Sequence, residues 1–199
     1  MKVVQRQHHL LREFVKSSPL IDMRGQLNSL FRSKYWNGQR FLHTQSMKEH
    51  TTLLLSYNQD CSLATVVLNR PKKKNAFSKV MYNELDTTLR VLSGDKRVKV
   101  ILLTGAGDNY SSGNDLSNFS ELMHPLTIAK QSREICYSFV DSFITCEKPI
   151  IVAVNGPAFG IAVTVLGLCD SVFSSSSATY KTPFAELGQV SLIATDAYK

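Results

Sequence analysis

Residues 149–169 read PIIVAVNGPAFGIAVTVLGLC, a stretch of 21 residues without a charged side chain. A stretch of this length could cross a bilayer. The turn residues Asn155-Gly156-Pro157 at its centre, and Gly160 shortly after them, would break a membrane helix. We therefore expect no membrane span, and we predict a buried strand over 150–154, a tight turn, and a short apolar helix over 160–168.

On both sides of this stretch, strand and helix patterns alternate. Ser78 is a candidate N-cap for a helix whose apolar residues recur at helical spacing until Gly94. A second helix is predicted from about 127 to 146, and it must end before Pro149 because the residue preceding a proline avoids the α region. The segments with a strand pattern lie at 51–57, 61–69, 98–104, 170–174 and 178–182.

This alternation predicts an α/β fold with right-handed crossovers between parallel strands. The first two strand segments are joined by Asn58-Gln59-Asp60, which predicts an antiparallel hairpin. Two successive runs of strand, helix, buried strand and glycine-containing loop indicate a coiled repeat of ββα-like units.

The composition is that of a globular protein, with 43% of the 199 residues hydrophobic and 20% charged. The four cysteines, Cys61, Cys136, Cys146 and Cys169, form no Cys-x-x-Cys pair, so we predict neither a zinc site nor a disulfide scaffold. The formal net charge of +7 is concentrated in residues 1–50, which hold nine Lys and Arg against three acidic residues. Because the rest of the chain is nearly neutral, we expect no nucleic-acid binding.

Residues 1–46 are basic, contain serine and are poor in acidic residues, which is typical of an organelle transit peptide. They lack the long apolar run of a secretory signal. Glu13 and Asp22 weaken the targeting interpretation, and an extension without a targeting function is the alternative. The final residues, Asp-Ala-Tyr-Lys, are not a peroxisomal signal of the Ser-Lys-Leu type. We predict import into the mitochondrial matrix, with residues 51–199 forming the globular domain.

Two loops contain the small and polar residues that binding sites favour. Residues 110–116 read YSSGNDL and follow a buried strand, and residues 155–160 read NGPAFG and precede the apolar helix. Small residues let the backbone approach a ligand closely, and the second loop presents N–H groups at the start of a helix. Together the loops could stabilise a developing oxyanion with two backbone donors. Taken singly, each could be an ordinary turn.

Short motifs along the chain match those of one known family in order and spacing. They are NRPKKKNA at 69–76, SGNDL at 112–116, KPI at 148–150, NGPA at 155–158, LGLCD at 166–170, TPF at 182–184 and LGQ at 187–189. From about residue 52 to 189 the chain resembles the crotonase (enoyl-CoA hydratase/isomerase) superfamily, most of all its 3,2-trans-enoyl-CoA isomerase branch. The resemblance implies the crotonase-like coiled ββα superhelix, which we expect to be incomplete at the C-terminus.

The resemblance implies an acyl-CoA substrate whose thioester carbonyl is polarised toward an enolate by the backbone N–H groups of Ser112 and Ile161. The positions that it implies along the substrate are Ser112, Gly113, Asn114, Asp115, Leu116, Gly156, Pro157 and Gly160. At the CoA nucleotide it implies Lys72, Lys74, Asn75 and Ala76. Lysines suit CoA phosphates, although a solvated surface turn is the alternative for them. We expect no metal and no cofactor, because the coenzyme A thioester is itself the substrate.

An isomerase of this kind needs a base for the α-proton. The positions at which hydratase-like relatives carry acids hold Thr164 and Phe184, and the position of the glutamate of the isomerase branch holds Leu192. Glu186 is near but displaced. We therefore expect weak or no conversion of 3-enoyl-CoA to trans-2-enoyl-CoA, the step that this branch performs in unsaturated fatty acid β-oxidation.

Three functions stay open: an active isomerase, a non-catalytic acyl-CoA-binding or partner subunit, and a truncated splice product without function. After Gln189 the sequence no longer resembles the family, so we do not expect the helices that complete the CoA pocket and support a family-type homotrimer. Uncovered apolar surface on 160–168 and on the late strands would then favour association or instability. The peroxisome is the alternative compartment, because the resemblance is partly to peroxisomal enzymes.

Overall fold

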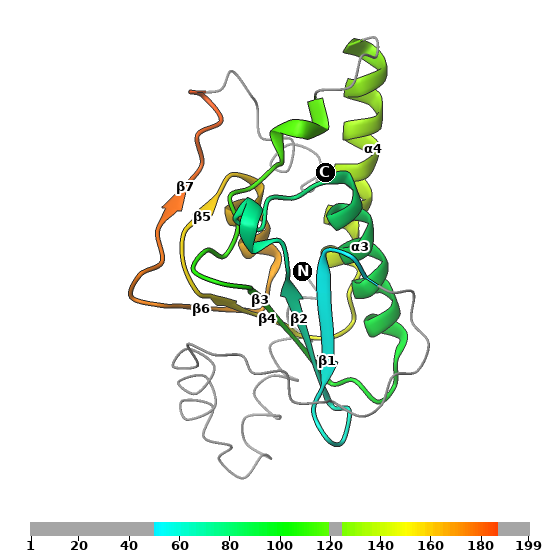
Figure 1. Cartoon of the computed structure of the whole chain (residues 1–199). Helices are drawn as coiled ribbons and strands as arrows, with labels where there is room; N and C mark the ends of the chain where they lie inside the picture. Colours follow the sequence, from blue (N-terminus) through cyan, green and yellow to red (C-terminus); the bar gives the residue numbers. More distant parts are fainter. Residues whose placement is uncertain (1–49, 120–124, 187–199) are drawn as a thin grey trace. The chain divides into compact units, whose positions relative to one another are not determined.

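A five-stranded sheet forms the centre of the fold, in the strand order β1-β2-β3-β4-β6 (Figure 1). The structure is a computed structural model that describes residues 50–119 and 125–186, so the predicted extension over 1–46 lies outside the described residues. β1 and β2 form an antiparallel hairpin, and β2, β3, β4 and β6 run parallel to one another. The strands are β1 (Leu53–Tyr57), β2 (Leu63–Leu68), β3 (Val100–Gly105), β4 (Ile150–Val154) and β6 (Ser171–Ser174).

The two central strands are apolar on both faces, as strands buried in a parallel sheet are expected to be. In β3 the first four residues are all buried, and in β4 four of the five are. Their register pairs Ile101 with Ile150 and Thr104 with Ala153. The loops that follow β3 and β4 therefore leave the sheet at the same edge, which is where parallel sheets commonly hold their sites.

The turn between β1 and β2 is built by side chains that bond to the backbone. The Asn58 carboxamide oxygen accepts from the Leu63 N–H at 2.8 Å, and its Nδ2 donates to the Ser62 hydroxyl at 3.1 Å. The Asp60 carboxylate accepts from the N–H of Ser62 at 3.0 Å. Such short-range bonds from Asn and Asp are what favour these residues in turns, and the predicted hairpin is confirmed.

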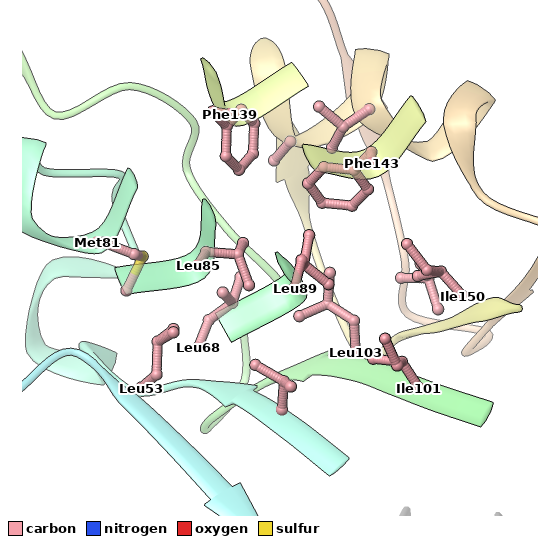
Figure 2. Packing of buried hydrophobic residues seen from close by; sticks show 14 of the residues in the cluster. Leu53, Leu68, Met81, Leu85, Leu89, Ile101, Leu103, Phe139, Phe143 and Ile150 are labelled. Atoms are coloured by element: carbon pink, nitrogen blue, oxygen red, sulfur yellow. The ribbon is translucent and has the colours of Figure 1, made fainter. Parts of the chain in front are cut away.

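Two long helices supply the rest of the core. Helix α3 (Lys79–Gly94) begins after Ser78, whose hydroxyl accepts from the Met81 N–H, as predicted for an N-cap. Helix α4 (Pro125–Ile144) begins and ends two residues earlier than expected. Figure 2 shows Leu85 and Leu89 of α3 between the aromatic rings of α4 and the strand residues. The side chains labelled in that cluster are Leu53, Leu68, Met81, Leu85, Leu89, Ile101, Leu103, Phe139, Phe143 and Ile150.

The uncharged stretch at 149–169 folds as strand, turn and helix. After β4 come the two-residue strand β5 (Ala158–Phe159), helix α5 (Ile161–Thr164) and the 3₁₀ helix η3 (Val165–Leu168). The single helix expected over 160–168 is thus split into an α turn and a 3₁₀ turn. Strand β5 pairs with β7 (Tyr180–Lys181) in a separate two-stranded parallel sheet. No helix in the described part of the chain has both the length and the apolarity to cross a bilayer.

Apolar side chains are exposed on the late strands, as expected, but less so on the segment before them. Val172 and Phe173 of β6 and Tyr180 of β7 are exposed. Ala162 and Val165, by contrast, are buried in the main core. The expectation of an uncovered segment over 160–168 is therefore wrong for its inner face, because α5 and η3 pack that face against the core.

Candidate functional site

The loop after β3 is bonded to the segment just before α3. The Phe77 N–H donates to the Gly113 carbonyl at 2.8 Å, and the Asp115 N–H donates to the Phe77 carbonyl at 3.0 Å. These two bonds form a parallel bridge between Phe77 and Asn114. In a parallel bridge the central residue turns its own N–H and C=O away from its partner, so the Asn114 N–H points away from Phe77.

The neighbouring N–H groups of this loop are occupied. The Ser112 N–H donates to the Lys74 carbonyl at 2.9 Å, and the Gly113 N–H donates to the Ser111 hydroxyl at 3.1 Å. Ser112, the expected oxyanion donor, is therefore engaged within the protein. Among the described residues nothing accepts from the N–H of Asn114. Among the described residues, the N–H of this loop that has no acceptor is thus that of Asn114 and not that of Ser112.

The second loop contains the other expected donor, the N–H of Ile161. The N–H groups of Ala158, Phe159 and Gly160 donate to the carbonyls of Thr179, Ser111 and Lys181, at 2.8 to 3.0 Å. In the described part of the chain, the Ile161 N–H has no acceptor. It is the first N–H of α5, and the first N–H groups of a helix have no partner inside it.

The two loops touch directly. The N–H groups of Tyr110 and Ser111 both donate to the Pro157 carbonyl at 3.2 Å. A side chain on Gly113 would put its Cβ 2.6 Å from the Phe159 carbonyl oxygen, and Gly113 has φ +82°, so only glycine fits there. Asn114 and Ile161 each follow a glycine, and the Gly113 Cβ position lies 3.7 Å from the Gly160 nitrogen. Two N–H groups that have no acceptor among the described residues are therefore held on adjoining loops.

Asn75, expected at the CoA nucleotide, instead connects its own loop to the loop after β3. It is fully buried, and its carboxamide oxygen accepts from the Arg70 N–H at 2.9 Å. Its Nδ2 donates to the carbonyls of Ala106 and Asn109, at 2.9 and 2.8 Å. Its side chain is thus unavailable to a ligand, because all of these bonds are internal. This role is a correction to the sequence-based expectation.

The other predicted nucleotide contacts divide into exposed and buried positions. Lys72 and Lys74 are exposed on and beside the 3₁₀ helix η1 (Pro71–Lys73). Ala76 is buried, and its carbonyl accepts from the Arg70 guanidinium at 2.5 Å. The lysines can therefore meet an anion in solvent, whereas the Ala76 side chain is packed away from it.

Asp115 forms an ion pair within the protein. Its carboxylate lies 2.9 Å from the Arg70 guanidinium and accepts from the N–H and the hydroxyl of Ser117 at 3.0 and 2.8 Å. Partial burial acts to raise its pKa, but the bonds from Ser117 and Arg70 outweigh burial and lower the pKa below its usual value. Asp115 therefore stays ionised and ties the site loop to the segment at 70–76. Its neighbour Leu116, also expected along the substrate, is 74% exposed.

Gly156 and Pro157 build the second loop. Gly156 is buried so closely against Asp108 that a Cβ would lie 2.0 Å from the Asp108 carbonyl oxygen. The Pro157 carbonyl accepts the two N–H groups from the first loop. Both residues position the donors, and Gly160, with φ +55°, sets the entry into α5.

Thr164, Phe184 and Glu186, the described side chains at the positions considered for proton transfer, are not placed to act as a general base. The Thr164 hydroxyl donates to the Ile161 carbonyl at 3.2 Å, and a Phe184 ring carbon lies 3.9 Å from the Cβ position of Gly160. Glu186 is exposed and pairs with Lys181 at 3.0 Å. Leu192 lies outside the described residues. Within residues 50–119 and 125–186, no group of three or more His, Cys, Asp and Glu side chains could hold a metal ion.

Two residues of this region carried no signal in the sequence. Asn118 donates to the Asn114 carboxamide oxygen at 2.8 Å, and the buried Tyr82 hydroxyl donates to the same oxygen at 3.4 Å. Burial raises the pKa of Tyr82 far above its usual value, so the hydroxyl keeps its proton. Tyr82 is 32 residues from Asn114 in the chain, and no local pattern predicts such a contact.

Comparison with known proteins finds a matching family and curated relatives. The family model described as enoyl-CoA hydratase/isomerase matches residues 58–198. Human enoyl-CoA delta isomerase 2 is 47% identical over 130 residues, which are 64% of this chain and 32% of the human protein. Mouse enoyl-CoA delta isomerase 3, peroxisomal, is 44% identical over 129 residues, 64% of this chain and 40% of that protein. The chain thus spans about a third of the length of these curated relatives.

Solved structures show the same fold. An enoyl-CoA hydratase/isomerase from Pseudoalteromonas atlantica matches with a TM-score of 0.60 and 34% identity, over 69% of this chain and 52% of that one. An enoyl-CoA hydratase/carnithine racemase from Magnetospirillum magneticum matches with a TM-score of 0.66 and 28% identity, over 74% and 54%. The expected α/β fold of the crotonase type is confirmed.

Proposed function

The chain belongs to the enoyl-CoA hydratase/isomerase family, and from that premise we propose that it binds acyl-CoA thioesters at the adjoining loops after β3 and β4. The two curated relatives described above are both named as enoyl-CoA delta isomerases. The proposed chemistry is therefore of the Δ3,Δ2-enoyl-CoA isomerase kind, in which a double bond moves through a thioester enolate, and we expect this chain to perform it weakly or not at all.

One observation carries this proposal: the N–H groups of Asn114 and Ile161 have no acceptor among the described residues and lie on loops in direct contact. Two backbone donors of this kind suit a carbonyl oxygen that gains negative charge. The rigid loop contacts mean that little rearrangement is needed when that charge develops. Asn114 replaces Ser112 as the proposed first donor.

For the nucleotide end of the ligand, we propose the exposed lysines of the turn at 72–74. Lys72 and Lys74 stand on a loop whose backbone is bonded to the first site loop through the Lys74 carbonyl and the Ser112 N–H. Ammonium groups there would meet phosphate oxygens in solvent, where such pairs are weak and sensitive to salt. Asn75 and Ala76 shape this turn from inside.

A non-catalytic acyl-CoA binder is the second candidate function. It is favoured by the state of Glu186, whose carboxylate is exposed and paired with Lys181. A base must reach the proton that it removes, and a surface carboxylate in an ion pair is poorly placed for this. Both candidates bind acyl-CoA, so they differ only in turnover.

Calorimetry with octanoyl-CoA and free coenzyme A tests the proposed binding. We expect octanoyl-CoA to bind more tightly to the purified 199-residue chain, because the thioester oxygen adds two hydrogen bonds, each worth about 0.5–1.5 kcal/mol net. Equal affinity for the two ligands, or no binding of either, would remove the acyl-CoA function.

The cellular location is a further proposal. The basic, acid-poor composition of residues 1–50 supports import into the mitochondrial matrix, and the printed name of the mouse relative supports the peroxisome as the alternative. A fluorescent protein placed behind residues 1–50 should collect in mitochondria. A cytosolic signal would contradict the targeting proposal. The expectation against a family-type homotrimer stays a prediction, which sedimentation of the purified chain tests.

A further inference from the structure

The Asn118 side chain forms three hydrogen bonds within the protein. Its Nδ2 donates to the Asn114 carboxamide oxygen at 2.8 Å and to the Phe77 carbonyl at 2.9 Å. Its Oδ1 accepts from the Lys79 N–H at 3.1 Å. A backbone N–H can only donate and a carbonyl can only accept, so these partners define which end of the amide is oxygen and which is nitrogen.

Two of the three bonds go to the bridge between Phe77 and Asn114, in which the Asn114 N–H has no acceptor among the described residues. Phe77 already holds the residues on either side of Asn114, through the Gly113 carbonyl and the Asp115 N–H. Asn118 adds a bond to the Asn114 side chain itself and a second bond to the Phe77 carbonyl. The peptide group that carries the Asn114 N–H is thus held by the hydrogen bonds of the neighbouring backbone and by the hydrogen bond of the Asn114 side chain.

We propose that Asn118 is a positioning residue that keeps the Asn114 N–H directed at the thioester oxygen of a bound acyl-CoA. This inference rests on the proposed function. It adds a residue outside the two loops, located on the 3₁₀ helix η2 (Leu116–Phe119). Without the hydrogen bonds of Asn118, the Asn114 peptide can rotate. A donor that is no longer preorganised stabilises a developing charge less well.

Two substitutions distinguish a role of Asn118 in positioning the Asn114 N–H from a role only in anchoring the start of α3. Asn118→Ala removes all three bonds. Asn118→Asp keeps an acceptor for the Lys79 N–H, but it loses both donors and places a carboxylate oxygen against the oxygens of Asn114 and Phe77. If Asn118 only anchored the start of α3, Asp would serve as well as Asn. Under the positioning role, Asn118→Asp is as damaging as Asn118→Ala.

The test compares octanoyl-CoA with S-octyl-CoA, a thioether that lacks the carbonyl oxygen, on the full 199-residue chain. The ratio of their affinities isolates the oxygen contact, and partial unfolding lowers both affinities equally without changing the ratio. We expect both Asn118 variants to reduce the thioester preference by about 2- to 12-fold, the range that one ordinary hydrogen bond represents. The affinity for S-octyl-CoA should stay unchanged.

Carbon-13 NMR of octanoyl-CoA labelled at the thioester carbonyl provides a second readout. Polarisation by the two N–H groups should move the bound carbonyl resonance downfield from its free position, and in both Asn118 variants it should return part of the way. Asn58→Ala is the matched control, because Asn58 also bonds a backbone N–H and a side chain, but in the β1–β2 turn. It should change neither the ratio nor the resonance.

The outcomes distinguish this inference from the proposed function. A wild-type chain with no preference for the thioester would overturn both. A wild-type preference that persists in Asn118→Ala or Asn118→Asp, with an unchanged carbonyl resonance, would overturn the positioning role alone.

Discussion

Asn75 shows how one buried residue can define the shape of a site loop. It adopts a left-handed backbone conformation, with φ +53°, which asparagine tolerates better than most residues. Its side chain bonds the Arg70 N–H and the carbonyls of Ala106 and Asn109. This carboxamide therefore adds to the bonds that hold the loop at 70–76 against the loop after β3.

We predict that Asn75→Ala lowers the free energy of unfolding by about 2–4 kcal/mol. The reason is that three partly buried backbone groups lose their partner, and each should cost less than the roughly 1–3 kcal/mol of a fully buried unsatisfied group. Urea denaturation followed by circular dichroism measures the change. Asn58→Ala, in the exposed hairpin turn, is the control and should cost much less. Equal losses in the two variants would contradict the role assigned to Asn75.

Gly113 gives a second prediction at the residue scale. Gly113→Ala should destabilise the chain by about 1–3 kcal/mol and weaken octanoyl-CoA binding, because φ +82° is strained for alanine and the added Cβ would meet the Phe159 carbonyl. Gly94→Ala is the matched control: it is in a helix, and nothing lies within 4 Å of the added Cβ. It should leave stability unchanged or raise it. Thermal unfolding and calorimetry measure both effects.

At the scale of elements, one carboxylate connects the start of the globular domain to the middle of α3. Glu84 accepts from the N–H and hydroxyl groups of Thr51 and Thr52, at 2.6 to 3.0 Å. Partial burial acts to raise the pKa of Glu84, but the four hydrogen bonds together outweigh burial and lower the pKa. The segment before β1 is thus attached to α3, which begins 27 residues after Thr52.

The lowered pKa of Glu84 predicts how this attachment depends on pH. A carboxyl whose pKa is lower in the folded state stabilises the protein above its unfolded value, near 4.5, and that contribution is lost as pH falls through the folded pKa. Glu84→Gln should therefore cost about 1 kcal/mol at pH 7, allowing for solvent exposure. The difference from wild type should shrink below about pH 4.5.

Urea denaturation at pH 7, 5, 4 and 3 measures this difference, and only the comparison with wild type is informative, because other carboxyls titrate in the same range. Glu134→Gln on the exposed face of α4 is the control and should match wild type throughout. A constant gap between Glu84→Gln and wild type at every pH would contradict the prediction.

At the scale of the whole molecule, binding of the ligand and the proposed reaction require different groups of the protein. Binding a thioester needs the two N–H groups, whereas moving a double bond also needs a base. We predict that the chain shifts the double bond of 3-octenoyl-CoA at or near the background rate, since a positioned acid–base group contributes about 10²–10⁴-fold. A direct spectrophotometric assay of the 2-enoyl product measures this rate.

Two variants and one extension accompany that assay. Leu192→Glu alone should restore little activity, whereas a family-like continuation after Gln189 that includes a glutamate should restore much more. Glu186→Gln should leave the rate unchanged, because the Glu186 carboxylate is exposed and paired with Lys181. Robust turnover by the unaltered chain would contradict this expectation, and loss of that turnover in Glu186→Gln would identify the base.

Local pattern was sufficient to predict the five strands of the main sheet, the two long helices and the two loops of the candidate site in the described part of the chain. The uncharged stretch at 149–169 contains its own turn residues, so its division into strand, turn and helix follows from neighbours in the sequence. The family resemblance implied the donor at Ile161, and local structure is consistent with it, because the first N–H groups of a helix have no partner within that helix.

The donor of the first loop was decided by tertiary structure alone. Ser112 and Asn114 are two residues apart and both could present an N–H to a ligand. The Lys74 carbonyl takes the first, and the bridge to Phe77 turns the second outward. Both partners lie more than 35 residues earlier in the chain. Whether a backbone N–H is free depends on the register of such distant contacts, and local sequence pattern does not contain that register.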